Sequence, residues 1–351
     1  MTTFHHALRR HFVFRSLAAW LAAGSMATGA MSAALAQEGS GAAAASRTPT
    51  GKVPAAVSVL SIVEHPSLDA LRDGLHDELK DAGYQDGKSL HWAYQSAQGN
   101  QGTAVQIARK FVGDRPDVIV PIATPAAQAV VSATHQIPVV YNAITDPIAA
   151  QIVKSMAPSG TNVTGVSDKL VADRQVAFIK RVVPDAKRVG IIYSPAEANS
   201  VSATREMKVA LEKQGISLVE VAAPRSIDVG QAAQRLVGKV DVIYTSNDNN
   251  VISAYESVIK VANAAKIPLI CADRSSVQRG ATGAMAIDYY RMGRQTGRMV
   301  LRILNGEKPG DIASETSDRL DITLNLDAAR RQGATLSPEL QAEASEIFGK
   351  P

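Results

Sequence analysis

The sequence has little of what most enzymes use for catalysis. Its one cysteine, Cys271, lies in the apolar run PLICAD, so no intramolecular disulfide can form, and a buried structural thiol is favoured over a nucleophile. No G-x-S-x-G motif is present. No H-x-x-H or H-E-x-x-H spacing joins the histidines beyond residue 36, which are His65, His76, His91 and His135. We therefore expect a protein that is not an enzyme and that uses no metal or other cofactor.

A large excess of charge of either sign is also missing. The 37 Lys and Arg residues nearly balance the 33 Asp and Glu residues. Three of the positive charges, Arg9, Arg10 and Arg15, precede an apolar run over 17–35 and the small residues that end at Ala36. This order is typical of a secretory signal peptide, and it predicts cleavage after Ala36 and a periplasmic protein. The remaining 34 basic and 33 acidic residues provide no basic excess, so no nucleic-acid partner is expected.

Two other interpretations of the leader (residues 1–36) stay open. A membrane anchor would need a more strongly apolar segment, because Gly24 and Ser25 interrupt this one. The pair Arg9-Arg10 also resembles a twin-arginine signal, which leaves the export route undecided. Residues 37–54 are rich in Ala, Gly and Ser and are predicted to form a flexible linker.

Short β-branched runs alternate with longer amphipathic stretches beyond the linker. The predicted strands are 57–63, 90–95, 117–123, 138–143 and 163–166, and the predicted helices are 68–82, 103–112, 125–134 and 147–154. Runs such as VIVPIA are apolar throughout, as expected for strands with helices on both sheet faces. The alternation predicts an α/β fold with a doubly wound, Rossmann-like parallel sheet.

The same alternation then restarts. KRVGIIYS, ISLVEVAA, VDVIYTS and IPLICAD read as strands, with helices over 197–214, 229–237 and 251–265 between them. PDVIVPIATPAAQAV…QIPVVYNA in the first half parallels VDVIYTSNDNNVISA…KIPLICAD in the second. This internal similarity favours two lobes of the same fold. A strand from 283, a helix over 291–309 and a final strand over 319–329 follow.

Polar residues gather where the predicted strands end. Parallel sheets bind ligands at the carboxyl ends of their strands, so two such edges facing each other would enclose a solute. The candidate ligand-binding residues are Glu64 and His65; Thr124, Pro125 and Ala126; Asn142, Thr145 and Asp146; Tyr193, Glu197, Asn199 and Ser200; Asn247 and Asp248; and Asp273.

A helix that begins at Pro125, with Thr124 as its N-cap, would present free backbone N–H groups to a ligand carboxylate. Thr145, before Asp146 and Pro147, repeats the arrangement. The alternative is that both threonines are ordinary helix caps.

A ligand ammonium needs a carboxylate, and Asp248 and Asp273 are the first candidates, followed by Glu197. Each has an alternative role, because Asp248 could cap the following helix and Asp273 could pair with Arg274. Strand-end tyrosines could stack on an aromatic ligand or pack in the core.

Seven motifs occur in order over about residues 55–345: VEHPSLDALRDGLHDEL, ATPAAQA, ITDP, TNVTGVSD, IIYSPAEANS, IYTSNDN and IDYYRMGRQTGRMVLRILNGEKP. This set resembles the ABC-transporter substrate-binding proteins of tryptophan/tyrosine-type uptake systems, which have a type I periplasmic binding fold. The resemblance implies an N-terminal lobe (55–166 plus 289–309) and a C-terminal lobe (167–288 plus 310–351) joined by a three-segment hinge.

The resemblance also implies a function in uptake. We expect a monomer that captures a small molecule, an amino acid or related carboxylate, in the cleft and delivers it to the permease subunits of an ABC importer. Two alternatives remain. An exported ligand sensor that docks on a membrane receptor would have the same fold, and an enzyme is disfavoured by the missing catalytic motifs.

Overall fold

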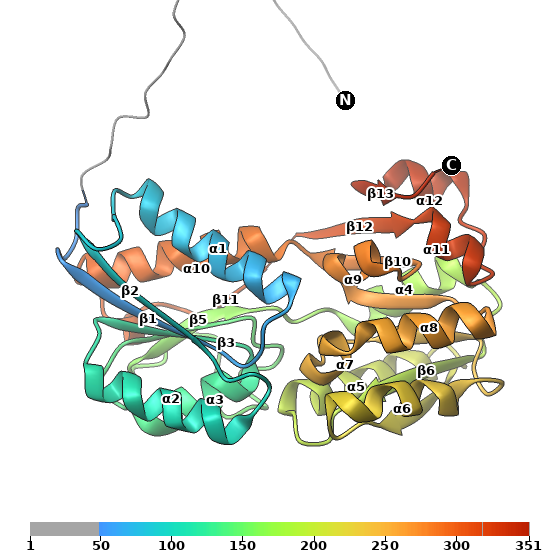
Figure 1. Ribbon diagram of the computed structural model, residues 1–351, viewed down its shortest axis with the longest axis horizontal. Coiled ribbons are helices and arrows are strands. Elements are labelled where there is room, and N and C mark those ends of the chain that lie inside the picture. Colours follow the sequence, from blue (N-terminus) through green and yellow to red (C-terminus); the bar gives the residue numbers. More distant parts are fainter. Residues whose placement is uncertain (1–48, 318, 351) are drawn as a thin grey trace, which may run out of the picture. The chain divides into compact units, whose positions relative to one another are not determined.

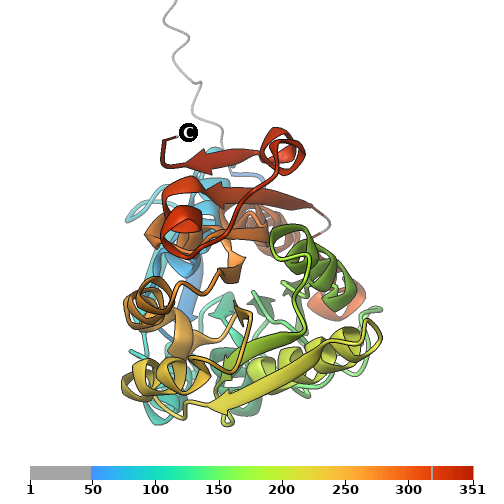
Figure 2. The ribbon, with the colours of Figure 1, turned by 90° about the vertical axis from the view of Figure 1, so that its right-hand side faces the viewer.

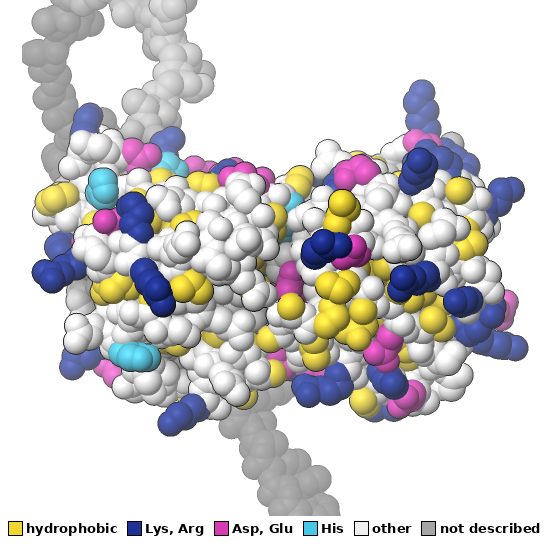
Figure 3. Space-filling model, turned by 60° about the horizontal axis from the view of Figure 1, so that its bottom comes forward, with side chains coloured by type: hydrophobic (Ala, Val, Ile, Leu, Met, Phe, Trp, Pro, Cys, Tyr) yellow, Lys and Arg dark blue, Asp and Glu magenta, His cyan; other side chains and the backbone are white. Residues whose placement is uncertain are grey.

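The computed structural model describes residues 49–317 and 319–350 (Figure 1). The predicted signal peptide and most of the predicted linker lie outside these residues. Within the described ranges, no helix is both long enough and apolar enough to cross a membrane. On the face shown in Figure 3, lysine and arginine side chains lie scattered among acidic ones.

The first sheet contains six parallel strands. Their order is β11 (Glu315–Thr316), β5 (Val163–Ser167), β4 (Val139–Asn142), β3 (Val118–Ile122), β1 (Ala55–Ser61) and β2 (Leu90–Ser96). Four helices cover it: α1 (Pro66–Asp81), α2 (Gln101–Asp114), α3 (Thr124–Ala133) and α10 (Tyr289–Leu304). In Figure 1, α1 and α10 lie above this sheet and α2 and α3 below it. Both faces are therefore buried, which explains the continuous apolar runs of its central strands.

Helices α1 and α10 come from opposite ends of the chain and pack closely. A Cβ atom on Gly293 would lie 2.0 Å from the Leu71 carbonyl oxygen, and one on Gly74 would lie 2.1 Å from the Tyr290 carbonyl oxygen. Only glycine permits this approach of two helix backbones. Gly293, the first glycine of RMGRQTG, therefore has a packing role.

The second sheet contains seven strands. Their order is β13 (Glu346–Phe348), β12 (Leu320–Asn325), β10 (Gly283–Ile287), β9 (Leu269–Asp273), β8 (Val242–Thr245), β6 (Arg188–Tyr193) and β7 (Ser217–Ala222). All neighbours pair in parallel except β10 and β12. Figure 2 views this part of the chain end-on, with helices on either side of the sheet.

Two hydrophobic clusters flank the second sheet. One lies under α4 (Ala172–Val182), α5 (Ala198–Glu212), α11 (Leu326–Arg331) and α12 (Pro338–Glu343). The other lies under α6 (Val229–Leu236), α7 (Asn249–Ser253), α8 (Tyr255–Ala265) and α9 (Arg274–Arg279). The two lobes, each an α/β sheet covered on both faces, confirm the predicted fold class.

Several predicted elements differ from the structure. No helix forms over 147–154, where the chain makes turns instead. The predicted helix over 251–265 is broken at Ala254 into α7 and α8. The predicted final strand ends at Asn325, whose side chain accepts from the Ala328 amide and starts α11. These interruptions are local hydrogen-bonding events that apolar periodicity does not reveal.

The chain passes between the sheets after β5, after β10 and between β11 and β12. Residues from 310 onward were predicted in the second lobe, but β11 pairs with β5 of the first sheet. The Thr164 hydroxyl also donates to the Ile312 carbonyl (2.9 Å). The sequence did not indicate this pairing, because the two-residue strand β11 has no apolar pattern of its own.

Candidate functional site

The carboxyl ends of the two sheets meet. Residues that follow strands of the first sheet contact residues that follow strands of the second. Side-chain hydrogen bonds that join them include Ser67 Oγ to Asp273 Oδ1 (2.9 Å), Ser202 Oγ to Asp146 Oδ2 (3.0 Å) and Asn247 Nδ2 to Asp168 Oδ2 (2.9 Å). The strand-end loops of the two lobes are therefore assembled into one site.

The N-terminus of α3 lies at this junction, but its cap differs from the prediction. The cap is Ala123, and Thr124 is the first helical residue. A φ of +72° at Ala123 turns the chain into the helix and leaves Thr124 only 1% exposed. Pro125 has no N–H, and the Ala127 amide is the first to bond back, to the Ala123 carbonyl (3.1 Å). The N–H groups of Thr124 and Ala126 have no acceptor within the helix.

Buried polar atoms without partners mark the same strand ends. Thr124 Oγ1 and both side-chain polar atoms of Asn142 have no hydrogen-bond partner among the described residues. Asn142 is fully buried and pairs in register with Ile122 of β3, which places it beside the start of α3. A buried polar group left unpaired costs about 1–3 kcal/mol. Such atoms are typical of a site completed by a ligand.

Backbone strain coincides with these atoms. Ala123 and Ala143, which follow β3 and β4, both have positive φ values, 72° and 56°. This region costs a residue other than glycine about 1–3 kcal/mol, and it is concentrated at ligand sites.

Asp168, which follows β5, is a buried carboxylate that sequence reasoning missed. It is 2% exposed, and none of the described ion pairs includes it. Its oxygens accept from Thr145 Oγ1 (3.0 Å), Asn247 Nδ2 (2.9 Å) and Tyr289 Oη (2.7 Å), which are all uncharged donors. Burial raises the pKa of Asp168, and these hydrogen bonds oppose the shift. An ammonium at Asp168 would supply the missing opposite charge.

The second lobe contributes more unpartnered atoms. Asn199 Oδ1, Ser246 Oγ and Asn247 Oδ1 are buried without a hydrogen-bond partner in the described part of the chain. Asn199 Nδ2 donates to the Asn247 carbonyl (2.9 Å) and to Glu197 Oε2 (3.0 Å), which fixes its amide in place. Each of the predicted residues Asn142, Asn199 and Asn247 therefore has a buried side-chain oxygen without a hydrogen-bond partner in the described chain.

Asp248, the first candidate for a ligand ammonium, caps a helix inside the second lobe, and its carboxylate has four donors from the chain itself. Oδ1 accepts from Ser194 Oγ (2.8 Å) and the Val251 amide (2.9 Å), and Oδ2 accepts from the Ser194 amide (2.7 Å) and Ser200 Oγ (2.6 Å). Four donors fill the acceptor positions of a carboxylate. Ser200, also predicted to bind ligand, donates within this network.

Glu197 lies in the same polar cluster. Its Oε2 accepts from the Asn199 side chain and from the Asn249 amide and side chain (3.0, 3.2 and 2.7 Å). Burial, and then the negative charge of Asp248, raise the pKa of Glu197 to about 7. Glu197 therefore links the loop after β6 to the loop after β8 and also holds the Asn199 side chain.

Asp273 lies at the contact between the two lobes. Its Oδ1 accepts from three donors: Ser67 Oγ (2.9 Å), Ser275 Oγ (2.6 Å) and the Ser276 amide (2.9 Å). Arg274, its predicted alternative partner, pairs with Glu346 instead (2.5 Å). Asp273 therefore caps α9 and contacts the start of α1.

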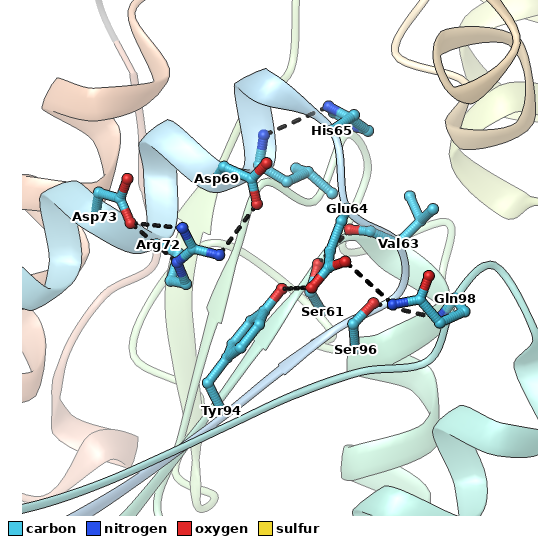
Figure 4. A network of polar contacts seen from close by, with 11 residues as sticks. Ser61, Val63, Glu64, His65, Asp69, Arg72, Asp73, Tyr94, Ser96 and Gln98 are labelled. Carbon is cyan, nitrogen blue, oxygen red and sulfur yellow. Dashed lines mark hydrogen bonds and ion pairs between the residues drawn. The ribbon is translucent and has the colours of Figure 1, made fainter.

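Figure 4 shows the loop that leads into α1. Glu64 is exposed and accepts from Tyr94 Oη (3.3 Å) and Gln98 Nε2 (3.1 Å). His65 caps α1 by accepting from the Leu68 amide (3.5 Å). Burial lowers the pKa of His65 to about 4, so the ring is neutral near pH 7. Glu64 and His65 thus both have partners within the first lobe.

The remaining predicted residues divide between site and scaffold. Thr145 contacts Asp168, as described above, while Asp146 accepts from the Ala149 amide (2.9 Å) and holds a turn. Tyr141 is fully buried in the core of the first lobe. Tyr193 is half-buried at the end of β6.

A cavity extends from Asp168 into the second lobe between α4 and α5. Its lining residues are Thr145, Asp168, Leu170, Ala172, Gln175, Ala203, Glu206, Met207, Tyr244, Ser246, Asn247 and Ala272. Sequence reasoning missed Asp168, Gln175 and Ser246. The Asp that directly follows TGVS could have been identified as a strand-end carboxylate, whereas Gln175 lies inside a helix without any local signal. In the described ranges, no group of three or more His, Cys, Asp and Glu residues could hold a metal ion.

The fold and the facing strand-end loops define a two-lobed solute-binding protein. A sequence model of the family described as ABC transporter substrate binding protein matches residues 56–348. The chain belongs to this family, whose members are binding proteins of ABC transporters and not enzymes.

Three relatives refine the comparison. The tyrosine-binding protein of Clostridioides difficile is 38% identical over 293 residues, which are 84% of this chain and 85% of the relative. The ABC domain of a Streptococcus pneumoniae protein in complex with L-Trp is 33% identical, with a TM-score of 0.81, over 84% of this chain and 99% of that one.

A ligand-free, open substrate binding protein from Clostridium difficile is 37% identical, with a TM-score of 0.65, over 84% of this chain and 100% of that one. The present structure therefore resembles the L-Trp complex more than the open form, although its sequence identity to the L-Trp complex is lower.

Proposed function

We propose that this protein captures an aromatic amino acid between its lobes and delivers it to the permease of an ABC importer. The observation that carries the proposal is the buried, uncompensated carboxylate of Asp168 at the same sheet edge as the unpartnered polar atoms of Thr124 and Asn142. A zwitterion provides the charges that these two positions lack.

The ammonium group would bind Asp168. Thr145, Asn247 and Tyr289 orient that carboxylate with three hydrogen bonds, so little reorganisation is needed when the ligand arrives. No bulk water competes at a 2% exposed group, which strengthens the charge interaction.

The carboxylate group would bind at the start of α3. The N–H groups of Thr124 and Ala126, the Thr124 hydroxyl and the Asn142 amide are suitable donors, and the positive end of the helix dipole favours an anion. β3, β4 and β5 are neighbours in the sheet, so this position and Asp168 lie at the same edge. A ligand that carries both an ammonium and a carboxylate group could contact both positions at this edge.

The relatives support the choice of an aromatic ligand, because one is named for tyrosine and another was solved with L-Trp. Export through the leader, cleavage after Ala36, a periplasmic location, a monomeric state and the permease partner belong to the proposal. The contacts between the lobes would form as the ligand closes the site.

The mature chain, residues 37–351, should show a higher melting temperature with aromatic amino acids in a thermal-shift panel of all proteinogenic amino acids. The expected dissociation constant is about micromolar or lower, which corresponds to about −8 kcal/mol. A panel with no response from any amino acid would remove the amino-acid function. Small-angle scattering should show a smaller radius of gyration with the ligand than without it.

A further inference from the structure

Gln175 of α4 presents a hydrogen-bond acceptor that nothing else in the proposed function uses. The side chain is 1% exposed, and its Nε2 donates to the Met285 carbonyl (3.0 Å). That bond identifies the nitrogen end of the amide, because a carbonyl accepts only from a donor. The other end, Oε1, has no partner among the described residues and belongs to a residue that lines the cavity next to Asp168.

Ser246, which follows β8, contributes a second polar atom to the same cavity. Its Oγ is buried and has no partner in the described ranges. Six of the other lining residues are apolar or aromatic, namely Leu170, Ala172, Ala203, Met207, Tyr244 and Ala272, and four are polar, namely Thr145, Asp168, Glu206 and Asn247. The apolar side chains, with the unpartnered acceptor of Gln175 and hydroxyl of Ser246 beside them, are complementary to an aromatic ring that carries its own hydroxyl.

We propose that Gln175 and Ser246 select ligands whose side chain ends in a phenol. Gln175 Oε1 accepts from the phenol O–H, and Ser246 Oγ donates to the phenol oxygen. The inference rests on the proposed function, in which Asp168 binds the ammonium group of the same ligand. Tryptophan offers an N–H donor but no acceptor and so can use only Gln175, and phenylalanine can use neither residue.

Calorimetric titration of the mature chain with L-tyrosine, L-tryptophan and L-phenylalanine tests this assignment. The wild type should bind tyrosine at least about tenfold more tightly than phenylalanine, because phenylalanine leaves both polar atoms unpaired. Gln175→Met should weaken tyrosine and tryptophan each about tenfold and leave phenylalanine unchanged. Ser246→Ala should weaken tyrosine alone.

Ser276→Ala is a matched control, because Ser276 also has a buried Oγ without a partner in the described chain but does not line this cavity. It should leave the ratio of tyrosine to phenylalanine affinity unchanged. Equal wild-type affinities for these two ligands would overturn the selectivity assignment, as would a Gln175→Met variant that loses phenylalanine to the same extent. Retained phenylalanine binding also shows that the variant is folded. A wild type that binds no amino acid refutes the proposed function, and this inference with it.

Discussion

Replacing Asp168 by asparagine would remove the buried charge and keep the shape of the side chain. The introduced amide can accept from Asn247 and Tyr289 through its oxygen. Its NH2 group can donate to the Thr145 hydroxyl, which is also able to accept. The hydrogen-bond network therefore survives in a neutral form, and the substitution tests the charge alone.

The expected loss of affinity follows from the burial of the carboxylate. Removing one partner of a buried charge pair typically costs about 3–5 kcal/mol, so Asp168→Asn should weaken binding of an aromatic amino acid by about a hundredfold to a few thousandfold. The ligand-free protein should be as stable as wild type or more stable. Burial raises the pKa of Asp168, so its neutral form is favoured by folding, and this stability is lost as the pH rises through the folded-state pKa.

Two measurements together decide the role of Asp168. Calorimetry gives the affinity, and urea unfolding of the ligand-free variant gives the free energy of unfolding. A ligand analogue without the amino group, 3-(4-hydroxyphenyl)propionate, should bind Asp168→Asn at least as tightly as wild type. The matched control is Asp248→Asn, because Asp248 caps a helix and should lose stability with little direct loss of affinity. Unchanged affinity of Asp168→Asn for the amino acid would refute the assignment of the ammonium site.

Three further substitutions test other contacts. Thr124→Val should weaken ligand binding about five- to thirtyfold, because it removes a buried hydroxyl that has no partner in the described chain and that a ligand would satisfy. Calorimetry should show this loss of affinity, while urea unfolding should show no loss of stability in the ligand-free protein. The raised pKa of Glu197 means that the wild type should lose up to about 3 kcal/mol of unfolding free energy as the pH rises from below 4.5 through about 7. Glu197→Gln should remove this pH dependence. A wild-type free energy of unfolding that is constant over this pH range would contradict the raised pKa. Gly293→Ala should lower the free energy of unfolding by about 1–3 kcal/mol or more, because its Cβ would meet the Leu71 carbonyl, whereas Gly113→Ala, with open space around it, should be neutral or stabilising in the same assay.

The fold could be predicted because its signals are local and repeated. Runs such as VIVPIA are apolar throughout only because helices cover both faces of the sheet, and the repeated alternation indicated two such lobes. The strand-end loops that were predicted to face each other do contact one another in the structure. Short elements such as α9, β11 and β13 were missed, because their sequences contain neither a continuous apolar run nor a helical period.

The assignment of roles within the site could not be predicted in the same way. Asp168 and Asp248 both follow a strand in a polar loop, and the sequence analysis chose Asp248 and not Asp168 as a candidate for binding a ligand ammonium. Four donors surround Asp248, whereas Asp168 receives only neutral hydrogen bonds beside a cavity. Which donors reach a carboxylate depends on residues far away in the sequence: Tyr289 is 121 positions from Asp168, and Ser67 is 206 positions from Asp273.

The sequence by itself therefore determined the two covered sheets, their strand-end loops and the family, because apolar periodicity and ordered motifs are properties of neighbouring residues. Only the tertiary structure decided which polar atoms are left without a partner. That outcome depends on how loops from both lobes pack together, because a buried atom binds a ligand only where no other part of the chain has satisfied it.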